Sequence, residues 1–143
     1  MTIKKPALKS VFQHRSEAFS LTELLIVLAI IGILILIALP NLMPKIAEAK
    51  AQEAKLQLKH IHTLQKTYFY VHTKYSTDMA ELGFEHAKLT TDGGNANYQI
   101  EVVEANNATF LARATAISDF DGDGQLNVWE IDQDLNLKEV TKD

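Results

Sequence analysis

FSLTELLIVLAIIGILILIALPNLMP, residues 19–44, is the segment around which this chain is organised. No charged residue lies between Glu23 and Lys45, and residues 24–39 are apolar throughout, if their single glycine is counted as apolar. A helix that is apolar on every side has to be buried in a large core or in a membrane. At about 1.5 Å per residue, a helix over residues 19–39 would extend roughly 31 Å, which matches a bilayer core of about 30 Å. We therefore expect a membrane-spanning helix here.

The segment that precedes the apolar run, residues 1–18, is basic. It holds four basic residues and one acid, namely Lys4, Lys5, Lys9, Arg15 and Glu17. A basic segment before an apolar run is typical of a secretory signal, but this run is longer than a signal core and no small-x-small cleavage pattern follows it. The small residue Ala18 lies before the run instead. The basic flank should stay in the cytoplasm, which places the carboxyl-terminal part outside.

Glu23 is a carboxylate near the end of this apolar helix, where a charge is unfavourable. One interpretation is local, because Ser20-Leu21-Thr22-Glu23 fits a capping box in which Glu23 reaches back to the helix cap. The other interpretation is that Glu23 needs a positive partner within the membrane or an assembly. A cut after Ala18 would create such a partner, the free ammonium group of Phe19.

The string AFSLTEL, residues 18–24, together with the apolar run and the ALPNL of residues 38–42, resembles the class III signal sequence of type IV pilins and type II secretion pseudopilins. The resemblance implies that a prepilin peptidase cuts between Ala18 and Phe19 and methylates the new amino terminus. It further implies that Glu23 pairs with the terminal ammonium of a neighbouring subunit during assembly. The family usually has Gly before the cut, where this chain has Ala18.

The same resemblance implies a set of partners. The precursor would sit in the bacterial inner membrane, meet the prepilin peptidase and the inner-membrane assembly machinery, and enter a homo-oligomeric helical filament. Gly32 and Pro40 bracket the segment that resembles the part often melted in assembled pili.

Residues 45–75 have the pattern of an amphipathic helix. Residues 45–73 contain no Gly or Pro and are rich in good helix formers. Pro40 and Pro44 either end the membrane helix or interrupt a helix that resumes after them, and the composition favours resumption. Apolar residues recur at three- and four-residue steps, which predicts one buried stripe: Ala54, Leu58, Ile61, Leu64, Tyr68, Val71 and Tyr75.

Residues 76–143 make up the remaining, globular region, and after a loop at residues 92–97 the sequence changes to a period of two. Tyr98, Ile100 and Val102 alternate with other residues, and residues 109–117, 127–132 and 135–140 also read as strands. We therefore predict an α+β chain, in which a long amino-terminal helix packs on a small antiparallel sheet of about four strands. This is the arrangement that the pilin resemblance implies.

Residues 119–130, DFDGDGQLNVWE, predict an EF-hand-type calcium loop between strands. Ca²⁺ takes six to eight oxygen ligands, and acids at alternate positions before a glycine turn can converge on one ion. The predicted ligands are Asp119, Asp121, Asp123, the Gln125 carbonyl, Asn127 and Glu130. Because the chain has no Cys, we expect Ca²⁺ to replace a disulfide as the staple of this region. The alternative is a solvated acidic turn.

The net charge and the lack of catalytic motifs argue against two classes of function, nucleic-acid binding and enzyme activity. After a cut at Ala18 the chain would keep 10 basic and 17 acidic residues, a net charge of −7. This acidic balance argues against a sequence-independent grip on nucleic acid, which needs Lys and Arg. No catalytic motif is present, so we expect no enzyme activity.

The sequence therefore predicts a structural subunit of a filament, with an extracellular type IV pilus favoured over a periplasmic pseudopilus. The major type II pseudopilin usually carries a Pro-Trp-Gly-type segment in its carboxyl-terminal half. Here no Pro follows Pro44, and Trp129 lies in the acidic loop. A monomeric, membrane-anchored calcium-binding protein that keeps its leader is the alternative from another class.

Overall fold

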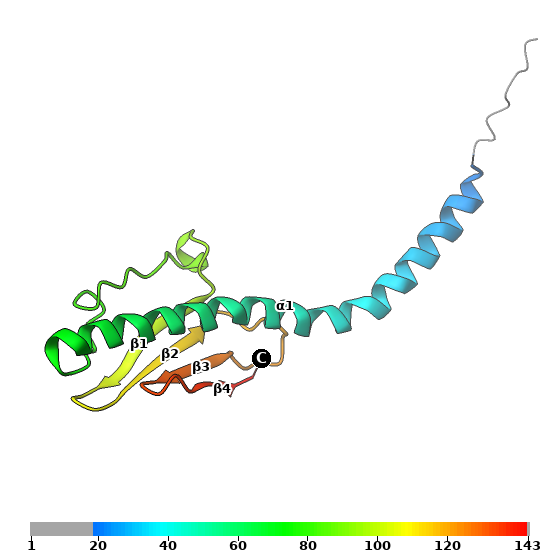
Figure 1. Ribbon diagram of the computed structural model, residues 1–143. Coiled ribbons are helices and arrows are strands. Elements are labelled where there is room, and N and C mark those ends of the chain that lie inside the picture. Colours follow the sequence, from blue (N-terminus) through cyan, green and yellow to red (C-terminus); the bar gives the residue numbers. More distant parts are fainter. Residues whose placement is uncertain (1–18, 143) are drawn as a thin grey trace, which may run out of the picture. The chain divides into compact units, whose positions relative to one another are not determined.

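The computed structural model describes residues 19–142, so the predicted leader, residues 1–18, lies outside the described part. The elements are the helix α1 (Leu21–His72), the short 3-10 helix η1 (Thr90–Asp92), and the strands β1 (Tyr98–Ala105), β2 (Phe110–Ala116), β3 (Val128–Asp132) and β4 (Leu137–Thr141). Figure 1 shows this order along the chain. The chain divides into two compact units after Leu36.

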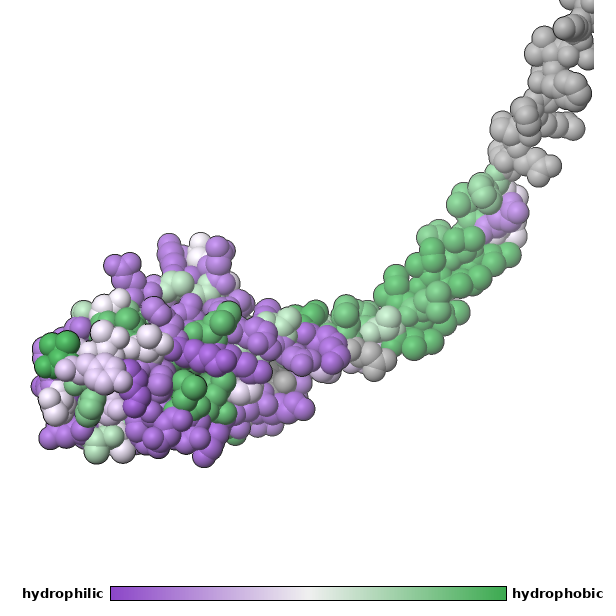
Figure 2. Space-filling model, viewed as in Figure 1, coloured by the Kyte–Doolittle hydropathy of each residue, from purple (hydrophilic) through white to green (hydrophobic). Residues whose placement is uncertain are grey.

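The unit before Ile37 is the first part of α1. Within the described residues, Leu21–Pro40 is the one segment long and apolar enough to cross a membrane, with a mean hydropathy of 2.9 and no part of it buried. Figure 2 shows this stretch as continuous hydrophobic surface, broken only at its first turn. None of these side chains is buried by the described residues 19–142, so lipid or other protein is expected to cover them.

The second part of α1 continues through both prolines, Pro40 and Pro44, as helix to His72. The prediction that the helix resumes is therefore confirmed, and the residues at Pro40 are helical rather than melted. Each proline removes one backbone donor from the helix, at a cost of about 3 kcal/mol in a regular interior. The good helix formers that follow allow α1 to continue.

The strands form one antiparallel sheet in the order β1-β2-β3-β4, as a simple meander. The predicted α+β fold is confirmed at this level. Register shifts occur between Val102 and Glu104 in β1 and between Val128 and Trp129 in β3. Figure 1 shows the later half of α1 running along one face of the sheet.

The core lies between α1 and that face of the sheet. The strands contribute alternate residues, as the period of two predicted, with Tyr98, Phe110, Ala112, Ala114 and Ile131 almost fully buried. From α1 the predicted stripe contributes Ala54, Leu58 and Ile61, all completely buried, with Leu64 and Tyr68 packed at its edge.

The stripe differs from the prediction at its end. Val71 is 72% exposed, whereas Tyr75, which follows the end of the helix at His72, is buried as predicted. The buried face instead includes Gln65, whose side chain has no exposed surface. Helical spacing alone cannot identify a polar residue in such a place.

Candidate assembly helix and acidic loop

The amino-terminal end of α1 is closed by a capping box. The Ser20 backbone N–H and hydroxyl both donate to Oε2 of Glu23, at 2.8 and 3.0 Å, and the Glu23 amide donates to Ser20 Oγ at 3.2 Å. Glu23 therefore forms the predicted capping box with Ser20. A cut before Phe19 would leave the Ser20 amide intact, so the cap is compatible with a second, intermolecular partner for Glu23.

Gly32 has open space around it within the described part of the chain. A Cβ added there would have no heavy atom within 4 Å outside the local helix. Packing among the described residues therefore does not require glycine at this position.

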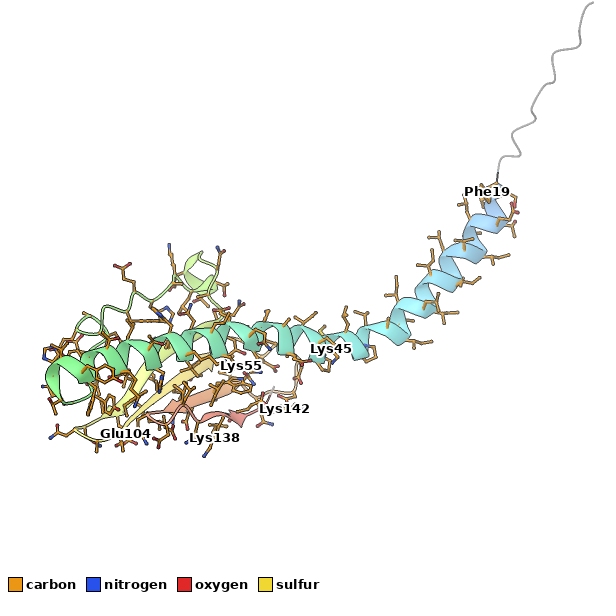
Figure 3. The ribbon with its side chains drawn as sticks, viewed as in Figure 1. Phe19, Lys45, Lys55, Glu104, Lys138 and Lys142 are labelled. Carbon is orange, nitrogen blue, oxygen red and sulfur yellow. The ribbon has the colours of Figure 1, made fainter. Side chains whose placement is uncertain are left out.

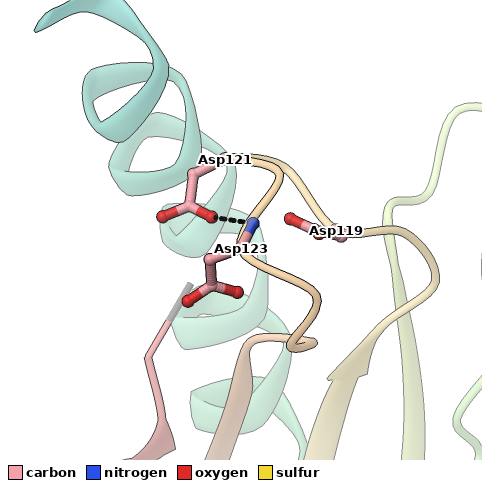
Figure 4. Close-up of side chains that lie close together, drawn as sticks. All are labelled: Asp119, Asp121 and Asp123. Atoms are coloured by element: carbon pink, nitrogen blue, oxygen red, sulfur yellow. Dashed lines mark hydrogen bonds between the residues drawn. The ribbon is translucent and has the colours of Figure 1, made fainter. Parts of the chain in front are cut away.

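The acidic loop lies between β2 and β3, where the sequence predicted it. One carboxylate oxygen from each of Asp119, Asp121 and Asp123 lies within 4.8 Å of the others. Figure 4 shows the three side chains around one turn of the loop, with the Asp123 amide donating to Asp121 Oδ1 at 3.0 Å. Three hard oxygen donors at this spacing fit a divalent cation such as Ca²⁺.

Two glycines shape this turn. Gly122 and Gly124 have φ values of 86° and 89°, which a residue with a Cβ rarely adopts. Their amides donate to the two oxygens of Asp119, at 2.5 Å from Gly122 and 2.7 Å from Gly124. These bonds, from Gly124 first and then Gly122, hold the pKa of Asp119 below its ordinary value of 3.8. Asp119 is therefore kept ionised and in place.

The remaining predicted ligands lie differently. The Gln125 amide donates to Asp123 Oδ1 at 2.7 Å, so Gln125 borders the group. The buried Asn127 amide accepts from the Tyr98 hydroxyl and donates to Glu139 and the Thr141 carbonyl. The Asn127 side chain therefore fastens β4 to the core instead of facing the loop.

Glu130 is also engaged elsewhere. Its carboxylate pairs with Arg113 across the β2–β3 register, with Glu130 Oε1 2.7 Å from Arg113 Nη2. The structure thus brings together three of the six predicted ligands. A role for Glu130 as a ligand stays a prediction, and it would require this ion pair to open.

An anchor of the acidic loop was missed at the sequence level. Phe120, between two of the acids, is buried, and Lys50 Nζ lies 4.0 Å from its ring centroid. The Tyr98 ring is 5.8 Å away. These contacts tie the loop to α1 and β1. The only signal in the sequence was an aromatic residue inside an acidic run.

Comparison with known proteins decides the family. A family model described as "Type IV minor pilin ComP, DNA uptake sequence receptor" matches residues 40–126, more than half of the chain. A second model, the prokaryotic N-terminal methylation motif, matches residues 13–39. The chain belongs to the type IV pilin family. The resemblance predicted from residues 18–42 is confirmed, and the family is structural.

A curated relative of this pilin is the type IV major pilin protein PilA of Myxococcus xanthus (strain DK1622). The two are 47% identical over 100 residues, which cover 70% of this pilin and 46% of the relative. This pilin therefore matches about half of the relative's length.

Proposed function

We propose that this pilin is a structural subunit of an extracellular type IV pilus. The observation that carries the proposal is the wholly unburied apolar segment Leu21–Pro40 on a chain whose remaining part has its own core. Such a helix is stable in lipid, and it is equally well covered by copies of itself in a filament. The two type IV pilin matches favour a pilus over a pseudopilus or a lone anchored protein.

The route to the filament begins with a precursor in the inner membrane. A prepilin peptidase cuts between Ala18 and Phe19 and methylates Phe19, which the methylation-motif match over residues 13–39 supports. Glu23 then accepts the ammonium group of a neighbouring subunit. The pairing lowers the cost of carrying a carboxylate within an apolar assembly.

Replacement of Glu23 tests this assembly step. We expect Glu23→Leu to reduce fibres recovered by shearing cells at least tenfold while membrane-bound subunit persists. The matched control is Glu48→Gln, because Glu48 is exposed on the part of α1 outside the apolar segment. Normal fibre yield from Glu23→Leu would contradict the proposal.

Calcium is the second element of the proposal. Asp119, Asp121 and Asp123 would hold Ca²⁺, with backbone carbonyls and water completing its shell. The ion would neutralise three neighbouring acids and stiffen the connection between β2 and β3. Its role is that of a staple in a chain without Cys.

The matched family model is that of a DNA uptake sequence receptor, whereas the net charge of this pilin argues against binding to DNA. Residues 19–143 carry a net charge of −7, which repels a phosphate backbone. We therefore keep filament assembly as the proposed function, and the absence of DNA binding stays a prediction.

A further inference from the structure

The connection between α1 and β1 contains an exposed segment that is held at both of its ends. Phe84 before it and Ala96 after it are buried, whereas none of residues 85–95 is buried. Where the connection enters β1, the Glu53 carboxylate of α1 accepts from the Asn97 backbone N–H and from Asn97 Nδ2, both at 2.8 Å. Figure 1 shows this connection, which includes η1, between the end of α1 and the start of β1. Residues 85–95, the strap, are therefore tied down at their two ends.

Between these ends, His86 joins the strap to the sheet. The backbone N–H of Ile100 in β1 donates to His86 Nε2 at 2.9 Å. The other hydrogen bonds that residues 85–95 form with described residues stay within residues 85–97. Among the described residues, one histidine nitrogen is thus the acceptor that fastens the strap to β1.

The partners of His86 determine its protonation state. A backbone N–H can only donate, so Nε2 has to offer a lone pair to Ile100. Nδ1 lies 2.6 Å from the carbonyl oxygen of Ala87, which can only accept, so Nδ1 carries the proton. The ring is therefore neutral in this arrangement. A second proton would occupy Nε2 and face the Ile100 N–H, and two donors cannot form a hydrogen bond.

No charged group holds the His86 ring by another contact. Four charged or titratable groups lie within two residues of His86, beside its contact Ile100, or against the neighbouring Phe84 ring: Glu85, Lys88, Glu101 and His60. Among the described residues, none of them forms an ion pair or a hydrogen bond with His86. The ring is also exposed, so a proton from solvent can reach it.

The bond to His86 lies at an edge of the sheet. In the order β1-β2-β3-β4, the strands β1 and β4 each have one neighbour. Figure 3 labels one residue on each of these edge strands, Glu104 on β1 and Lys138 on β4. An unpaired N–H on an edge strand can pair with another chain, and covering the edge with a loop prevents this. The strap therefore covers the edge of β1 at Ile100 as long as His86 accepts.

We propose that His86 is an acid-released latch that holds the strap on the edge of β1. Neutral His86 keeps the Ile100 N–H paired. Protonated His86 cannot accept, so the strap separates from β1 and the Ile100 N–H becomes available to water or to another strand. Histidine is the side chain that ordinarily changes its charge between about pH 5 and 8, so mild acid is the expected signal.

Amide hydrogen exchange at Ile100 tests the latch directly, because local opening is measured residue by residue. The full-length protein in detergent micelles would be followed by NMR at about pH 7.5 and about pH 5, the two sides of the range in which histidine changes its charge. Each exchange rate would be divided by the intrinsic rate at the same pH. We expect the protection of Ile100 to fall at least tenfold in acid, while the amides of β3 keep theirs and so exclude global unfolding.

Two variants separate the latch from a general effect of acid. His86→Gln has an acceptor that does not titrate, so the acid-dependent loss at Ile100 should disappear. His62→Gln is the matched control, because His62 Nε2 lies 3.2 Å from the Gln133 carbonyl oxygen and not on the strap, and it should behave like the wild type. Long-range proton–nitrogen spectra should place the His86 proton on Nδ1 at neutral pH.

Three results would overturn the proposal. The first is equal protection of Ile100 at both pH values in the wild type. The second is a loss in His86→Gln as large as the loss in the wild type. The third is a His86 proton on Nε2 at neutral pH, since Nε2 could then not accept from Ile100.

Discussion

Gln65 shows how much a single residue can fix in this fold. Its side chain has no exposed surface, accepts from the Ser76 amide at 3.1 Å and donates to the Ser76 carbonyl at 2.6 Å. It therefore replaces the backbone pairing that the chain loses where it leaves α1. The apolar stripe of α1 was predictable from spacing, but Gln65 was not, because its partner lies 11 residues away on a turn that the sequence does not reveal.

We expect Gln65→Leu to lower the free energy of unfolding by about 1–3 kcal/mol, because it leaves the Ser76 amide and carbonyl buried without partners. Chemical denaturation of the full-length protein in detergent measures the change. Gln52→Leu, at an exposed position of the same helix, is the control. Equal stabilities for the two variants would show that the Ser76 clamp contributes nothing.

Glu81 gives the pH dependence expected of this fold. Its Oε2 accepts from the Ser76 hydroxyl at 2.8 Å and the Tyr68 hydroxyl at 3.0 Å, and these bonds hold the pKa of Glu81 below its ordinary value of 4.5. A carboxyl group whose pKa is lower in the folded state than in the unfolded state stabilises the fold at pH values above its unfolded-state pKa. This stabilisation is lost as the pH falls through the pKa of the folded state.

Glu81→Gln should therefore lower the melting temperature at pH 7, and the difference from the wild type should shrink below pH 4.5. Thermal melts across this range check the prediction. Glu85→Gln, at an exposed position, is the control. A difference that is constant with pH would mean that ionisation of Glu81 does not contribute.

The elements were largely predictable, and the exceptions have physical causes. The strands were evident because one buried face imposes alternation over the first six residues of β1 and along the whole of β2. The acidic loop was evident from alternate acids and a glycine. The sequence did not show which of the acids would converge. Glu130 pairs with Arg113 across the sheet, and a local motif does not reveal a partner on another strand.

The loop between β2 and β3 carries the calcium prediction. A ligand that binds only the folded state adds about 2.7 kcal/mol of stability at roughly 100 times its Kd. Chelation should therefore lower the melting temperature of the full-length protein by several degrees, and Tb³⁺ luminescence should be sensitised by Trp129. Asp121→Asn/Asp123→Asn should abolish both effects, while Asp92→Asn in η1 should retain them. A wild-type melting temperature unchanged by chelator would rule out the staple.

At the scale of the whole molecule, two unlike surfaces share one chain. Leu21–Pro40 exposes apolar side chains that nothing in the described chain covers, whereas the helix-and-sheet part has its own core and a mostly hydrophilic surface (Figure 2). This division could be predicted from the sequence, because no charged residue lies between Glu23 and Lys45, whereas charged residues are frequent after Lys45. The contact between Lys55 and Trp129 could not be predicted in this way, because it joins residues far apart in the sequence.

The most direct test of the account is the mass of the subunit in sheared native filaments. Intact-protein mass spectrometry with amino-terminal sequencing should find a chain that begins at methylated Phe19, since removal of residues 1–18 creates the ammonium group that Glu23 needs. A filament subunit that still begins at Met1, or the absence of this protein from filaments, would contradict the account.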